Sequence, residues 1–129
     1  MKAVVSEGAT ARSVGELRSV AGSAAGPVAL NGVITAGTAV FSNSTPPPHL
    51  IDLVEQISPR SMLLIHSPKD DPDEPRFNRA FYEAAGAPKD IWGVPEAGHV
   101  GAQEARPLEY EQRVTRFFDR ALLGRETHE

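Results

Sequence analysis

The apolar run Met62-Leu63-Leu64-Ile65 is the feature that most constrains the fold of this chain. It is continuous rather than alternating, and turn-forming residues bound it, with Ser58-Pro59 before it and Ser67-Pro68 after it. A strand that is covered on one face alternates apolar and polar residues, whereas a strand covered on both faces forms a continuous apolar run. The run therefore predicts a strand of a parallel sheet that is covered on both faces.

Strands and helices alternate along the rest of the chain. Two further segments have strand character, residues 3–6 and 89–94. Spacing of apolar residues and capping signals predict helices after Ser13, after Pro27, over 50–57, from Asp73 to Gly86, and from Pro107 to Leu123. Strands that alternate with helices imply parallel pairing through right-handed crossovers. The predicted fold class is therefore α/β, with three layers and a small parallel sheet of about three strands flanked by helices.

Composition excludes several classes of function. The chain has no cysteine, so it holds no disulfide, thiolate metal site or cysteine nucleophile. Its 13 basic and 17 acidic residues give a net charge of −4, and no basic run marks a nucleic-acid surface. The first seven residues lack the apolar core of a signal peptide, so we expect a cytoplasmic protein. A length of 129 residues predicts a single domain over 1–129.

One long segment carries no charge. From Ser19 to Ile51 the sequence contains no Asp, Glu, Lys or Arg. Gly, Ser, Thr, Asn and Pro interrupt it throughout, so it does not form the ~20-residue apolar stretch of a membrane span. We interpret residues 22–58 as a helical, cap-like insert that is buried or faces a partner, and we do not expect membrane contact.

Two acid–base residues follow predicted strands. Asp70 comes after the strand at 62–65, and His99 comes after the strand at 89–94. In open α/β sheets, ligands gather at the carboxyl ends of the strands. A carboxylate and an imidazole there fit a Ser-His-Asp relay, because the acid fixes the histidine tautomer and stabilises its charged form. Spacing alone leaves open that Asp70 is a turn residue and that His99 is a solvated loop residue.

The sequence around these two residues resembles the C-terminal half of an α/β-hydrolase, closest to the esterase and dipeptidyl-peptidase-like branches of serine hydrolases. The likeness rests on the segments Pro59 to Asp70, Phe81 to Gly86 and Trp92 to His99, and on the apolar closing helix. It implies a partial α/β-hydrolase fold in which Asp70 is the catalytic acid and His99 is the general base. The implied reaction is hydrolysis of a small ester or amide.

The sequence departs from that family at two places. Ser67 stands where the family has glycine, and the acidic loop at 70–74 makes Glu74 the alternative acid. In addition, the G-x-S-x-G motif of the nucleophile occurs nowhere. The nearest imitation, Ala21-Gly22-Ser23-Ala24-Ala25, follows a predicted helix rather than a strand, so Ser23 is only an alternative nucleophile. The resemblance therefore implies a chain that needs a missing N-terminal half and is inactive alone.

A different prediction is a non-catalytic module that forms homo-oligomers. An α/β-hydrolase fold that lacks its N-terminal half would expose the edge of the first strand and the apolar helix at 30–41. We expect no cofactor. We also expect no metal, because His66, Asp70 and His99 lack the spacing of metal ligands.

Overall fold

Three parallel strands form a single sheet in the described part of the chain. The structure is a computed structural model that describes residues 2–11, 15, 17–18, 33–34, 36–37, 41–42 and 48–124. Strand β1 spans Ala3–Glu7, β2 spans Ser61–His66 and β3 spans Lys89–Gly93, in the spatial order β1-β2-β3. The predicted α/β class and small parallel sheet are confirmed.

The apolar run lies in the central strand of this sheet. β2 pairs with β1, where Val4 is opposite Met62, and with β3, where Leu64 is opposite Ile91. All four residues from Met62 to Ile65 are buried. The prediction of a strand covered on both faces is therefore correct.

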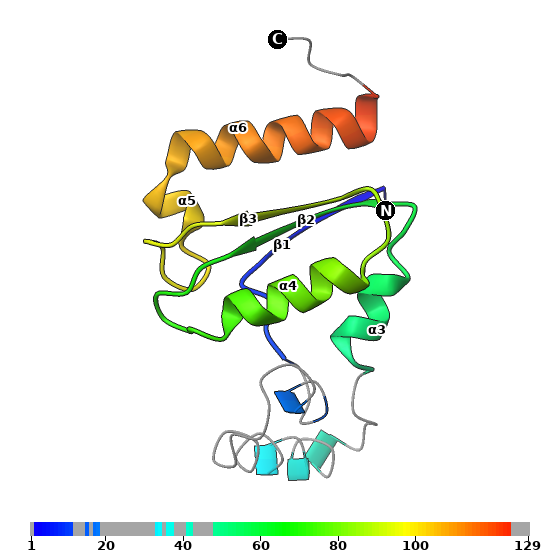
Figure 1. Ribbon diagram of the computed structural model, residues 1–129, viewed down its shortest axis with the longest axis vertical. Helices are drawn as coiled ribbons and strands as arrows, with labels where there is room; N and C mark the ends of the chain where they lie inside the picture. Colours follow the sequence, from blue (N-terminus) through cyan, green and yellow to red (C-terminus); the bar gives the residue numbers. More distant parts are fainter. Residues whose placement is uncertain are drawn as a thin grey trace.

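Helices cover the two faces of the sheet (Figure 1). Helix α6 (Pro107–Phe118) covers one face, and helices α3 (Leu50–Glu55) and α4 (Glu74–Ala84) lie on the other. Successive residues of a strand point to opposite faces. Leu63 and Ile65 therefore belong to the core beneath α6, whereas Met62 and Leu64 belong to the core beneath α3 and α4.

The helices depart from the predicted boundaries. α3 ends at Glu55, and turns occupy residues 56–59 instead of a last helical turn. The closing helix changes to a π-helix, η1 (Asp119–Leu123), and ends at Gly124, whose φ of 61° lies in the left-handed region. A short helix that was not predicted, α5 (Ala102–Ala105), precedes α6. The predicted helices after Ser13 and Pro27, and much of the segment 22–58, lie outside the described residues.

All three strands end at the same edge of the sheet, because they are parallel. The loop 67–73 leads from β2 to α4, and the loop 94–101 leads from β3 to α5. Backbone hydrogen bonds extend the pairing beyond the strands, from Gly8 N to Ile65 O at 3.0 Å and from Val94 N to His66 O at 2.9 Å. This edge therefore brings the two loops and the end of β1 together. No described helix is long and apolar enough to cross a membrane.

Candidate acid–histidine site

A buried carboxylate holds the ring of His99 at this edge. Nδ1 of His99 lies 2.9 Å from Oε2 of Glu74. The Glu74 side chain is 0% exposed, whereas the His99 side chain is 51% exposed. The second oxygen of Glu74, Oε1, accepts the backbone N–H of Ser67 at 2.8 Å. Both oxygens of the buried carboxylate are therefore paired, as a buried charge requires.

Glu74 points to this edge because it is the first residue of α4. The Cα–Cβ bonds of a helix tilt toward its N-terminus, so the first side chain turns back toward the preceding loop. Buried Phe77 and Phe81 hold α4 on the sheet. One turn into the helix, the side-chain amide of Asn78 donates to the carbonyls of Glu74 and Ala9, at 2.9 and 2.8 Å.

The Asp70 side chain contacts the same histidine, but at the histidine's backbone rather than at its ring. Oδ2 of Asp70 accepts the backbone N–H of His99 at 2.9 Å. A Cβ atom at Gly98 would collide with this carboxylate, so glycine permits the close approach of the two loops. The sequence put forward two acids, and the structure places Glu74 on the ring of His99 and Asp70 on its main chain.

Unusual backbone conformations surround the ring. Gly8 has a φ of 69°, and a Cβ atom there would lie 2.7 Å from Cε1 of His99. The ring therefore packs directly against the chain where it leaves β1. Val100 has a φ of 55°, a conformation that a β-branched residue rarely adopts. Such strain is common at functional sites, and here it falls on the residue that follows His99.

Glu74 also sets the electrostatics of the site. The hydrogen bond from Glu74 raises the pKa of His99 above its ordinary value, partial burial opposes the rise, and the charges of Glu74, Asp71 and Asp70 add to it. His66 at the end of β2 differs, because burial lowers its pKa. Of these two histidines, His99 is the one whose charged form is favoured, by the hydrogen bond that fixes its orientation.

This shift predicts a dependence of stability on pH. The folded protein binds a proton at His99 more tightly than the unfolded chain does, so the contribution is complete below the ordinary histidine pKa of about 6.5. We expect it to be lost as the pH rises above about 6.5 and through the raised pKa of His99. Urea unfolding at a series of pH values, for the wild type and for His99→Gln, measures this contribution as a difference.

The difference is needed because His66 acts in the opposite direction, its lowered pKa making the fold less stable at low pH. Both proteins contain His66, so its effect cancels. The quantity to follow is the unfolding free energy of the wild type minus that of His99→Gln. If this difference stays constant or grows as the pH rises, it would contradict the pairing of His99 with Glu74.

Two further residues were weighed from the sequence, Ser23 and His66. Ser23 is outside the described residues, so the structure does not place it. Nδ1 of His66 is buried and has no hydrogen-bond partner among the described residues, and its ring packs against Gly93. Within the same part of the chain, no group of three or more potential ligands lies close enough together to hold a metal ion.

The described residues do not supply a nucleophile to His99. In this part of the chain no serine or threonine hydroxyl forms a hydrogen bond with its ring. Ser67 bonds to Glu74 through its backbone N–H, but its Oγ is buried and has no partner among the described residues. Sequence reasoning did not anticipate the contribution of Ser67, which is its backbone N–H. Nor did it anticipate the packing of Gly8 on the ring, although a glycine directly after a strand signals such a close approach.

No family model, curated protein or solved structure matches the chain. The likeness to α/β-hydrolases therefore rests on the residues that carry it.

Proposed function

We propose that the chain contributes the acid and the histidine of a hydrolytic Ser-His-acid site that cleaves ester or amide bonds, with His99 as general base and Glu74 as orienting acid. The observation that carries the proposal is the 2.9 Å contact between Nδ1 of His99 and the fully buried carboxylate of Glu74. We assign the acid to Glu74 rather than Asp70 because only Glu74 contacts the ring. Asp70 instead holds the loop that carries His99.

The proposed chemistry follows from which ring nitrogen is occupied. Glu74 engages Nδ1, so Nε2 is the nitrogen left to take a proton from a serine hydroxyl as it attacks the carbonyl carbon. The Glu74 carboxylate then stabilises the imidazolium that forms. In the next step the imidazolium gives its proton to the leaving oxygen or nitrogen. The partial exposure of the His99 side chain supports access by such a substrate.

The nucleophile in this proposal lies outside the described residues. It is either Ser23 or a serine of the N-terminal half that the family resemblance implies. Without a nucleophile and an oxyanion hole, an acid–histidine pair has no group to activate, so we expect the described residues alone to be inactive. A cytoplasmic location is part of the same proposal.

A fluorophosphonate probe tests the proposal, because it reacts with a serine that a histidine activates. The protein should be purified under native conditions from cells that naturally make it, together with any chain that it binds or continues into. We expect one serine to be labelled, and mass spectrometry of the labelled peptide distinguishes Ser23 from a serine elsewhere. We expect His99→Gln to slow labelling by about a hundredfold or more, because general-base catalysis contributes at least that factor.

His49→Gln serves as the matched control, because His49 is an exposed histidine that precedes α3. It should label at the wild-type rate. Thermal unfolding of both variants shows whether they keep the fold. Absence of labelling, or labelling that folded His99→Gln leaves unchanged, would exclude the hydrolytic function.

Self-association is a second candidate function, which exposed apolar side chains favour. Phe41 is 93% exposed, and Val33 and Ile34 are also exposed. Within the described part of the chain β1 pairs only with β2, so its other edge has no strand partner there. Open edges and apolar surface both promote pairing with another chain. A stable homo-oligomer of the purified protein, together with failure of the fluorophosphonate probe to label it, would favour this function over hydrolysis.

A further inference from the structure

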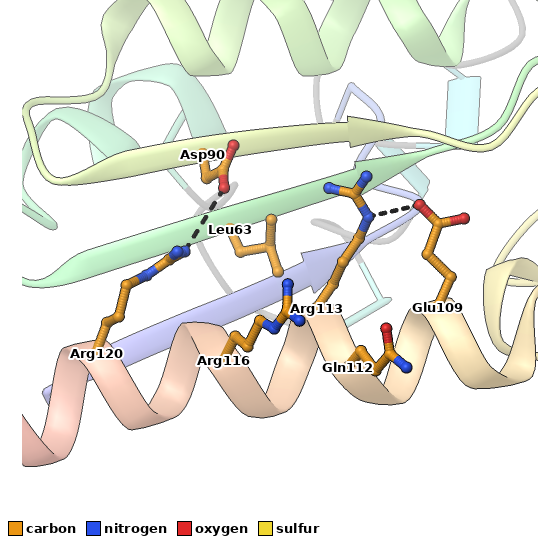
Figure 2. A pocket seen from close by; sticks show the side chains of 7 residues that line it. All are labelled: Leu63, Asp90, Glu109, Gln112, Arg113, Arg116 and Arg120. Carbon is orange, nitrogen blue, oxygen red and sulfur yellow. Dashed lines mark hydrogen bonds and ion pairs between the residues drawn. The ribbon is translucent and has the colours of Figure 1, made fainter. Parts of the chain in front are cut away.

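A cavity lined by arginines lies between α6 and the sheet, away from the acid–histidine site. Its volume is about 270 Å³. Figure 2 shows the guanidinium groups of Arg113 and Arg116 of α6 and of Arg120 of η1 around Leu63 of β2. The lining of the cavity includes Leu63, Asp90, Glu109, Arg113, Arg116 and Arg120.

The spacing of the arginines places them together. Arg113, Arg116 and Arg120 are three and four residues apart, so they lie along one side of the helix. Leu63, which forms the floor of the cavity, is buried in the core beneath α6. The three cations therefore flank an apolar floor.

Arg113 is held in place by two interactions. Its Nε donates to Glu109 at 2.8 Å, and its guanidinium lies over the ring of Trp92, 4.8 Å from the ring centroid. A guanidinium fixed in this way loses little freedom when it contacts a ligand. Arg113 therefore provides an ordered wall for the cavity.

The other two arginines are less engaged. Nη2 of Arg120 lies 3.9 Å from Oδ2 of Asp90, and this distance is at the long limit of an ion pair. Arg116 forms no ion pair or side-chain hydrogen bond with the residues that the structure describes. Three arginines face two carboxylates here, so the cavity has a surplus of positive charge in a chain whose net charge is −4. A local surplus of this sign attracts anions.

We propose that this cavity binds the phosphate group of a phosphorylated small molecule or lipid. Guanidinium groups present parallel N–H donors that match the oxygens of phosphate. The volume lies just below the range of about 300–1,000 Å³ typical of small-molecule pockets, so it suits one phosphate group better than a whole ligand. In this assignment Arg116 donates directly to the phosphate, and Arg113 and Arg120 flank it.

The proposed anion site is independent of the proposed hydrolytic function. Asp90 is the second residue of β3, so the cavity lies away from the carboxyl edge of the sheet where His99 and Glu74 meet. Loss of one activity therefore leaves the other testable.

Titration with inorganic phosphate at low ionic strength tests the proposal, followed through the NMR signals of the arginine Nε–H groups. We expect saturable shifts at Arg113, Arg116 and Arg120, which sodium chloride weakens. Arg116→Gln should weaken binding about tenfold, because it removes charged hydrogen bonds to the anion. The phosphate affinity of Arg116→Lys should fall between those of the wild type and Arg116→Gln, since lysine keeps the charge but not the paired N–H donors of the guanidinium group.

Arg76→Gln is the matched control, because it removes the same charge from an exposed arginine of α4 that pairs with Asp73. It should bind phosphate as the wild type does. Binding of phenyl phosphate, and of phosphatidylcholine vesicles that contain phosphatidic acid, is then compared between the wild type and the Arg116→Gln variant. If binding of phenyl phosphate depends on Arg116, the ligand is a soluble molecule. If binding of the vesicles depends on Arg116, it is a lipid headgroup. No saturable shift, or equal weakening in the Arg116→Gln and Arg76→Gln variants, would overturn the proposal.

Discussion

Replacing Glu74 with alanine should lower the pKa of His99 and reduce the free energy of unfolding by about 2–4 kcal/mol. The pKa falls because the hydrogen bond that raises it is removed. The stability falls because the buried backbone N–H of Ser67 loses its acceptor and a wholly buried side chain leaves a cavity. NMR titration of the His99 ring measures the pKa, and urea unfolding measures the stability.

Asp70→Ala is the discriminating control for this experiment. The Asp70 carboxylate is the smallest of the contributions to the raised pKa of His99, and it bonds to the backbone rather than to the ring. We expect a much smaller fall in the pKa of His99 than Glu74→Ala produces. The reverse order would make Asp70 the partner of the ring and contradict the assignment of Glu74 as the acid.

Replacing Phe81 with alanine should cost about 3–5 kcal/mol of stability. Phe81 is 0% exposed, and its ring stacks with that of Phe77 at 6.3 Å between centroids. A domain of this size is typically stable by about 5–15 kcal/mol, so the loss is a large share of the total. Because this pair holds α4 on the sheet, the pKa of His99 should also move toward its ordinary value. Urea unfolding and the NMR titration of His99 measure the two effects.

Leu108→Ala provides the comparison, because it removes a large apolar side chain that is 74% exposed at the start of α6. We expect its effect on the free energy of unfolding to stay within about 0.5 kcal/mol. A Phe81→Ala variant as stable as Leu108→Ala would show that the face beneath α4 does not carry the core.

The sheet was predictable because buried parallel strands have a strong local pattern. The runs at 3–6, 62–65 and 89–94 correspond to strands at 3–7, 61–66 and 89–93. Helix ends were less predictable. The change to a π-helix at Asp119 and the short helix at Ala102–Ala105 depend on tertiary packing, which spacing along the chain does not encode.

The partner of the histidine ring could be predicted only as a choice within the loop at 70–74. Sequence reasoning favoured Asp70 because it matches the family pattern, and kept Glu74 as the alternative. The structure decides between the two acids through the position of Glu74, which is the first residue of α4. A side chain at that position turns back toward the end of the preceding strand. The helix was predicted to start at Asp73, a residue type that favours the N-cap position. Asp73 occupies the capping position without a side-chain capping bond and instead pairs with Arg76 at 3.5 Å.

The arginine cavity was not predictable from the sequence. Three basic residues on one side of a helix are typical of a solvated face, and nothing in the sequence indicates that Leu63 of a distant strand forms a floor beneath them. The register of the sheet places Asp90 opposite Leu63, and this pairing creates the mixed charge of the cavity.

The side chain of Asn78 has a consequence for local opening of the fold. Its amide bridges Ala9, 69 residues earlier in the chain, to the first residue of α4. The chain leaving β1 therefore cannot separate from α4 without breaking a hydrogen bond at the helix turn that carries Glu74. Departure of residues 9–11 would therefore remove one of the two carbonyl acceptors of the Asn78 amide, at the helix turn that begins with Glu74. We therefore expect local opening of the segment that follows β1 to loosen the helix turn whose Glu74 orients His99.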